Sequence, residues 1–224
     1  MVYIFSAIFL YFFSGLLLYM LQRRILFNTS GHPGAPKEYK LLKTKEIYIT
    51  TEDGINLLSW HHLGNSNLPL LIYFQGNSYH IGDRANRIKK YIDVNWNVII
   101  LSWRGFGGNK GNPTEKNLYK DGEAILKWVR ENTKFSKNQI IIYGESLGSG
   151  VAVELGIRYS FLSIVLEAPF TSVSEIAMKR YRIFPTKYLV KDRFDNLSKI
   201  DKLKSPLLMN DRKMVERYPL TQNN

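Results

Sequence analysis

The segment Gly-Glu-Ser-Leu-Gly at residues 144–148 places one serine between two glycines with the spacing G-x-S-x-G. It follows the apolar run QIIIY (139–143) and precedes the small-residue run SGVAVELG (149–156). A tight turn between a buried strand and a helix is the setting in which such a serine projects as a nucleophile. An ordinary strand-to-helix turn is the alternative. We take Ser146 as the candidate nucleophile, with Gly144 and Gly148 letting strand and helix pass close together.

A second loop, Gln-Gly-Asn-Ser at 75–78, follows another apolar run at 69–74. Acyl transfer requires two backbone N–H groups aimed at the oxygen that gains negative charge. We expect one from Leu147, directly after the nucleophile at the start of its helix, and the other from Asn77. The loop could also be a plain strand-to-helix turn.

A serine nucleophile needs a base, and no histidine follows Ser146 in the chain. His80 lies in the loop that should bind the carbonyl oxygen, which is the wrong side for a base. Glu167 ends the apolar run 162–168 and is an alternative acid, although a polar strand-end residue that pairs with backbone is the favoured explanation. An acid alone cannot perform the proton transfers of histidine. The remaining histidines lie in the early part of the chain, at His32, His61 and His62.

Apolar runs joined by helical patterns predict a doubly wound, mostly parallel sheet of the α/β class. The segment 46–63 alternates as a two-stranded hairpin, and helices are expected at 81–93, 114–131 and 149–159. The segment 170–200 has mixed character, and its aromatic residues fit either a cap over an apolar substrate or ordinary core. The buried strands are expected at 69–74, 97–103, 139–144, 162–168 and 206–209.

The first 21 residues carry no charge and would extend about 31 Å as a helix, close to the hydrocarbon thickness of a bilayer. A signal peptide would show a basic start and a small-residue cleavage site, and a buried core helix would show a polar face. We therefore expect a transmembrane anchor at 1–22, a connector at 23–45 and one domain at 46–224. Arg23, Arg24 and several lysines follow the anchor, which predicts a single pass with the domain on the cytoplasmic side.

The chain of 224 residues contains no cysteine, which excludes disulfides and thiolate-bound metals. Its net charge is +12, but the basic residues are scattered, whereas a nucleic-acid partner would require a clustered stripe. The glycine-rich stretch 105–111 has Lys110 where a dinucleotide fingerprint needs its third glycine. We therefore expect no nucleic acid, cofactor or metal, and a loop that leads to a helix capped by Thr114.

Four motifs occur in order: Q-G-N, W-R-G-F-G…G-N-P-T-E…L-Y-x-D, G-E-S-L-G-S-G and L-E-A-P-F-T-S. This order resembles membrane-anchored α/β-hydrolase-domain proteins over roughly residues 45–208. The resemblance implies an α/β-hydrolase fold, Ser146 as nucleophile, and Leu147 and Asn77 as oxyanion donors. It also implies hydrolysis of an acyl ester or thioester through an acyl-serine intermediate.

The chain departs from that family pattern at two places. Gln75 stands where the family has histidine in H-G-N, which bears on the geometry of the loop. After the last expected strand the family continues H-G-x-x-D-x-x-V-P, whereas Arg212 occupies the place of the acid here and Asp211 lies one residue early.

We accordingly expect Asp211 to be at most a doubtful acid, and the last strand, the last helix and the triad histidine to be missing. These departures predict a serine hydrolase-like protein with little or no activity. The alternative is a non-catalytic membrane scaffold, or a degraded gene product of hydrolase descent.

Overall fold

The computed structural model describes residues 2–210, which form a seven-stranded sheet in the order β1-β2-β4-β3-β5-β6-β7. Strand β2 runs antiparallel to β1 and β4, and β4, β3, β5, β6 and β7 are mutually parallel. The strands are β1 (Lys45–Thr50), β2 (Asn56–His62), β3 (Leu70–Phe74), β4 (Asn97–Leu101), β5 (Ile140–Glu145), β6 (Ser163–Glu167) and β7 (Leu207–Asn210). This arrangement confirms the predicted mostly parallel α/β sheet.

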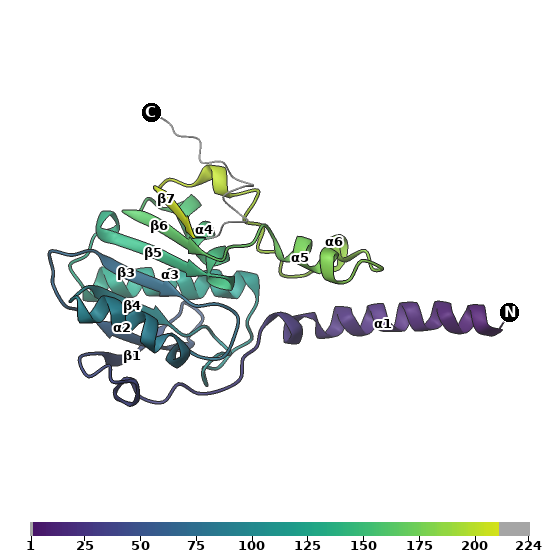
Figure 1. Ribbon diagram of the computed structural model, residues 1–224, viewed down its shortest axis with the longest axis horizontal. Helices are drawn as coiled ribbons and strands as arrows, with labels where there is room; N and C mark the ends of the chain where they lie inside the picture. The colour runs from purple at the N-terminus through teal and green to yellow at the C-terminus, as the bar shows by residue number, and fades with distance from the viewer. Residues whose placement is uncertain (1, 211–224) are drawn as a thin grey trace.

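Helices cover both faces of the sheet (Figure 1). Helices α3 (Glu115–Asn132) and α4 (Leu147–Arg158) pack on one face, and α2 (Ala85–Asp93) packs on the other. Strand β3 has buried residues throughout, with Leu70, Ile72 and Phe74 in the first core and Leu71 and Tyr73 in the second. A strand buried on both sides is apolar at every position, which is why 69–74 is a continuous apolar run.

The N-terminal helix α1 (Val2–Leu26) projects from the domain as a long rod (Figure 1). Its length and apolar composition are sufficient to cross a bilayer, and it is not buried by the rest of the chain. The helix continues to Leu26, past the expected anchor at 1–22, and it is followed at once by structure. Phe27 is buried edge-on against Phe106, and Asn28 forms a β-bridge with Ser78. The start of the expected connector therefore packs on the domain.

The segment 170–200 divides into two parts with different roles. Helices α5 (Val173–Arg180) and α6 (Thr186–Leu189) lie beside α1 as a cap, outside the sheet (Figure 1). Phe194, by contrast, is fully buried in the main core. It packs where Gly150 leaves room, since a Cβ at Gly150 would lie 2.5 Å from Cδ1 of Phe194. Phe194 is therefore ordinary core, whereas a cap over an apolar substrate stays a prediction for α5 and α6.

The remaining described segments contain four short 3-10 turns. They are Pro36–Tyr39, Ile81–Arg84, Lys137–Gln139 and Ile200–Lys202. The second leads directly into α2, so the helix expected at 81–93 is a 3-10 turn followed by an α-helix. Helix α3 begins where expected, because the hydroxyl of Thr114 accepts a hydrogen bond from the N–H of Asn117 at 3.1 Å.

Candidate active site

Ser146 lies in the sharp turn between β5 and α4, with φ 47° and ψ −111°. Residues other than glycine rarely adopt a positive φ, and holding one there costs about 1–3 kcal/mol. The turn is held by the neighbouring strand, because the N–H of Ser146 donates to the carbonyl oxygen of Glu167 at 2.9 Å. Strained placement of a serine between a strand and a helix is the backbone geometry of a nucleophile elbow.

The two glycines of the motif are required by close backbone contacts. A Cβ on Gly148 would lie 2.1 Å from the carbonyl oxygen of Phe74, and one on Gly144 would lie 2.7 Å from the carbonyl oxygen of Gly148. Both separations are far below contact distance, so α4 can begin directly behind β3 and β5 only because these positions lack side chains. The spacing G-x-S-x-G therefore reflects packing on both sides of Ser146.

Two backbone N–H groups beside Ser146 have no acceptor among residues 2–210, those of Leu147 and Asn77. Leu147 is the first residue of α4, where an N–H has no partner within the helix and the helix dipole favours negative charge. The loop carrying Asn77 lies against the nucleophile, since a Cβ on Gly76 would be 3.5 Å from Cβ of Ser146. These are the groups expected from the sequence as oxyanion donors, and that role stays a prediction.

The loop 75–79 is fixed from two directions. The indole N–H of Trp103 donates to the carbonyl oxygen of Gln75 at 3.0 Å. Asn77 is joined to the end of α1, because its side-chain amide donates to the carbonyl oxygen of Leu26 at 3.0 Å. Its carbonyl oxygen accepts from the N–H of Asn28 at 3.0 Å. The loop is therefore held on both sides, although Gln75 stands where the family has histidine.

Glu145, next to the nucleophile, is bound by a network on the α2 face of the sheet. Arg84 donates to its two carboxylate oxygens at 3.0 and 2.9 Å, and the hydroxyl of Tyr73 donates at 2.7 Å. Burial alone would raise the pKa of Glu145, but these hydrogen bonds outweigh it and the net pKa is lowered. Glu145 is therefore a charged anchor that holds the β5 end of the elbow.

Glu167, the alternative acid, is similarly engaged. Its carboxylate forms an ion pair with Arg87 and accepts a hydrogen bond from the hydroxyl of Tyr143 at 2.7 Å. Its backbone carbonyl oxygen is the group that receives the N–H of Ser146. These contacts favour a role in positioning the turn over a role as the acid of a triad, which stays untested.

Each of the four histidines contacts residues other than Ser146. His80 lies against Gly31, where a Cβ would meet its Cδ2 at 2.7 Å, with Nδ1 3.8 Å from the carboxylate of Asp83. His32 packs in the same way on Gly108. His61 meets the ring of Trp128 at 5.6 Å, and Nδ1 of His62 lies 3.2 Å from the carbonyl oxygen of Lys43. Within the described part of the chain no histidine is placed as a base for Ser146.

Asp211 lies outside the described residues, so its assignment as a doubtful acid stays a prediction. The same holds for the expected loss of the last strand, the last helix and the histidine. Among residues 2–210 no three His, Asp or Glu side chains gather in an arrangement that could hold a metal ion.

Sequence reasoning missed the role of one buried ion pair that connects two of the quoted motifs. Arg104, 1% exposed, donates from Nε to Oδ1 of Asp121 at 2.8 Å and from its backbone N–H to Oδ2 at 3.0 Å. Its other nitrogens reach Asp53 at 2.7 and 3.0 Å, and these hydrogen bonds hold the pKa of the Asp53 carboxyl well below its usual range. The arginine of W-R-G-F-G and the aspartate of L-Y-x-D thus form one structural unit that fixes the loop after β4 to α3.

A cavity of about 460 Å³ opens between α1 and the cap. Leu18 and Gln22 line it from α1, Ala177 lines it from α5, and Asn77 lies at one end. The candidate oxyanion donor Asn77 therefore borders this cavity.

Comparison with known proteins agrees with this geometry. Residues 67–222 match the family described as serine aminopeptidase, S33. An uncharacterized protein of Mycobacterium tuberculosis is 29% identical over 193 residues, which cover 84% of this chain and 68% of that protein. Human alpha/beta hydrolase domain-containing protein 17B is 33% identical over 140 residues, covering 62% of this chain and 47% of that protein.

Among solved structures, the esterase Pf2001 of Pyrococcus furiosus superposes with a TM-score of 0.69 at 19% identity, covering 87% of this chain and 82% of the esterase. That similarity shows a shared fold. The family match spans most of the chain and includes the elbow at Ser146 and the loop at Asn77. The chain therefore belongs to the serine aminopeptidase S33 family of α/β-hydrolase-domain proteins.

Proposed function

We propose that Ser146 is the nucleophile of a membrane-anchored hydrolase site that forms an acyl-serine intermediate from a carboxylic ester or thioester. The observation that carries the proposal is the strained serine flanked by two N–H groups without acceptors, those of Leu147 and Asn77. Attack of the hydroxyl oxygen on a carbonyl carbon, with the hydroxyl proton passing to water, would place the resulting oxyanion between these two donors. Collapse of this intermediate would break the bond to the leaving alcohol or thiol, which departs with a proton, and leave the acyl group on Ser146. The fold shared with an esterase of Pyrococcus furiosus supports the same chemistry.

Within residues 2–210 no histidine forms a hydrogen bond with Ser146, and we expect the site to react without a histidine base. With nucleophile and oxyanion donors but no base, a serine hydrolase retains roughly 10³–10⁴-fold acceleration over water. We expect slow acylation of Ser146. Helix α1 would anchor the site in a bilayer by a single pass, and Arg23 and Arg24 at its end favour the cytoplasmic side for the domain.

The test is covalent labelling of the full chain in detergent micelles with a fluorophosphonate probe. We expect slow labelling that is lost in Ser146→Ala and retained in the control Ser160→Ala, whose exposed serine follows the far end of α4. Added imidazole should accelerate labelling, because it supplies the missing base. Labelling of Ser146→Ala in the presence of imidazole measures the reaction of the probe at other residues, and this background is subtracted.

A second candidate function is a non-catalytic membrane scaffold of hydrolase descent. It is favoured by the position of all four histidines away from Ser146. Absence of Ser146 labelling both with and without imidazole would support the scaffold and overturn the proposed hydrolase.

A further inference from the structure

The groove between α1 and the cap has two apolar walls that face each other along their length. Gly15, Leu18 and Ile25 belong to the wall formed by α1. The opposite wall comes from the cap, with Ala177 on α5 and Phe184 in the loop between α5 and α6. A volume of about 460 Å³ lies within the range of roughly 300–1,000 Å³ that small-molecule sites occupy. The space is therefore large enough for a ligand, and its walls select an apolar one.

The outer end of the groove is closed by contacts between Tyr11, Gly15 and the loop at Phe184. The rings of Tyr11 and Phe184 stack at 5.1 Å, and the hydroxyl of Tyr11 donates to the carbonyl oxygen of Ile183 at 2.9 Å. Gly15 permits this approach, since a Cβ there would lie 3.2 Å from the ring of Phe184.

The inner end is joined by polar contacts. The amide of Gln22 donates to the carbonyl oxygen of Leu189 at 3.2 Å and accepts from the N–H of Lys191 at 2.8 Å. Arg23 forms an ion pair with Asp192 at 2.7 Å. Helix α1 is thus a built wall of the groove as well as an anchor.

Along its length, the groove changes from polar to apolar in the same direction as a lipid molecule in one leaflet, from headgroup to acyl chain. Arg23 and Arg24 mark the end of α1 where headgroups lie, and Asn77 borders the groove at that end. From Gln22 to Gly15 the helix extends about 10 Å into the hydrocarbon, about a third of the roughly 30 Å core of a bilayer. An ester at headgroup level would sit near Asn77 while its acyl chain lay along α1.

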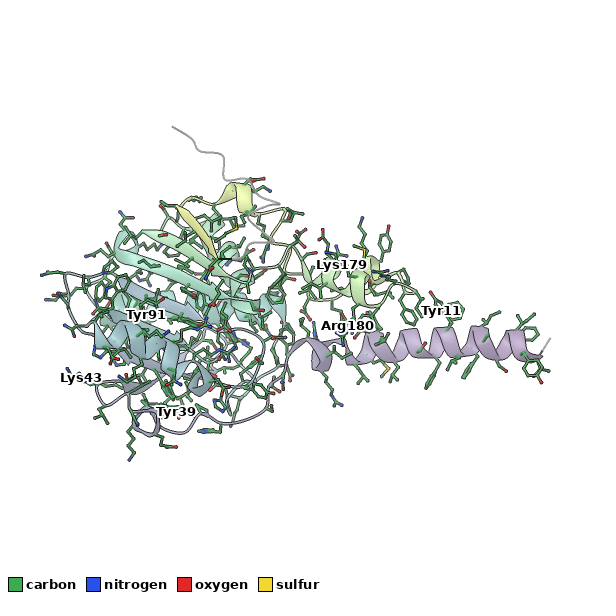
Figure 2. The ribbon with its side chains drawn as sticks, in the orientation of Figure 1. Tyr11, Tyr39, Lys43, Tyr91, Lys179 and Arg180 are labelled. Atoms are coloured by element: carbon green, nitrogen blue, oxygen red, sulfur yellow. The ribbon has the colours of Figure 1, made fainter. Side chains whose placement is uncertain are left out.

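The surface of the cap agrees with placement in a leaflet. Ile183 and Tyr188 of the cap are 71% and 76% exposed, and placement of the cap in a leaflet would cover both side chains with hydrocarbon. Lys179 and Arg180 are exposed basic residues at the end of α5, and Arg180 also lines the groove; Figure 2 shows both on the cap, with Tyr11 on the neighbouring α1. The mixture of exposed apolar and basic residues is typical of an interfacial element.

We propose that this groove binds the long acyl chain of an ester or thioester that resides in the bilayer, and guides its carbonyl to Ser146. The inference rests on the proposed function for the reaction, and on the groove alone for binding. Transfer from lipid to groove exchanges one apolar surface for another, so the groove contributes placement of the ester rather than hydrophobic affinity. The acyl chain enters the groove laterally from the leaflet, without leaving the membrane.

The first experiment measures binding without chemistry. The full chain carrying Ser146→Ala is reconstituted in phosphatidylcholine vesicles that contain a phosphatidylcholine with a diazirine at the end of one palmitoyl chain. Photo-cross-links should occur at groove residues such as Leu18 and Ala177, as well as at the lipid-facing residues Phe9 and Phe13.

The groove is then obstructed by Ala177→Trp, with Met178→Trp as the matched control on the exposed side of the same helix. Ala177→Trp should remove cross-links at Leu18 and leave those at Phe9, and Met178→Trp should change neither. Equal labelling of Leu18 in wild type and both variants would overturn the groove as an acyl site, whatever the activity of Ser146.

The second experiment compares fluorophosphonates with two-carbon and sixteen-carbon chains on the chain with an intact Ser146. Ala177→Trp should slow labelling by the long probe about tenfold or more, since pockets discriminate even single methylenes by roughly 10–200-fold. Labelling by the short probe should change less than twofold, which also shows that the variant is folded. If neither probe labels the wild type, the proposed hydrolase is contradicted. If Ala177→Trp slows labelling by both probes equally, the groove is contradicted.

Discussion

Ser146 carries backbone strain that glycine would relieve, and this leads to a prediction about stability. Its φ of 47° and ψ of −111° cost about 1–3 kcal/mol for a residue with a side chain. Glycine adopts such angles freely, but it gives the unfolded chain extra entropy worth about 0.4–1 kcal/mol relative to alanine. The balance predicts that Ser146→Gly is about 1 kcal/mol more stable than Ser146→Ala. Both variants lack the hydroxyl, so the comparison isolates the backbone.

Ser149 provides a matched pair with the opposite sign. It lies in the first turn of α4, where glycine destabilises a helix by roughly 0.5–1 kcal/mol relative to alanine. Both Ser149 variants lose the same 3.3 Å hydrogen bond with Asn196, which cancels in the comparison. We therefore expect glycine to be the more stable substitution at 146 and alanine at 149.

The assay is urea unfolding of the full chain in non-ionic detergent, followed by the fluorescence of the buried Trp60 and Trp103. Thermal unfolding gives a second measure, because 1 kcal/mol corresponds to a shift of about 2–4 °C for a chain of this size. The reasoning is refuted if the Ser149 pair behaves as expected and Ser146→Gly is no more stable than Ser146→Ala. That result would mean that the elbow is not strained.

Further perturbations test the contacts around the elbow. Gly148→Ala should destabilise the chain by about 3 kcal/mol in urea unfolding, because its Cβ would overlap the carbonyl oxygen of Phe74; a change below about 0.5 kcal/mol would contradict that contact. Glu145→Gln should cost about 2 kcal/mol at neutral pH. Since the folded pKa of Glu145 is lowered below its ordinary 4.5, the difference from wild type should shrink as pH falls below that value, and a constant difference between pH 7 and 3 would oppose this. Asp121→Ala should cost about 3 kcal/mol or more because it leaves Arg104 buried with one carboxylate partner fewer, and calorimetry showing a neutral effect would disprove the structural role of this pair.

Much of the fold followed from local patterns, for reasons that the structure makes explicit. Residues 69–74 and 139–144 are apolar at nearly every position because β3 and β5 have helices on both faces. Thr114 marks the start of α3 because its hydroxyl bonds to a backbone group three residues later. Interactions over so few residues leave a signature in a short window of sequence.

Residues 144–148 likewise identified the elbow from sequence alone, because the glycines and the serine act within one turn. The wall that α1 forms with the cap, and the hydrogen bond from Asn77 to Leu26, came only from the tertiary structure. Gln22 and Leu189 are 167 positions apart, and Arg23 and Asp192 are 169 apart. Pairings at such separations depend on how the whole sheet directs its loops, and either residue alone looks like an ordinary polar residue on a surface. The backbone geometry of one turn could therefore be predicted from the sequence, whereas the groove between α1 and the cap exists only once distant segments meet.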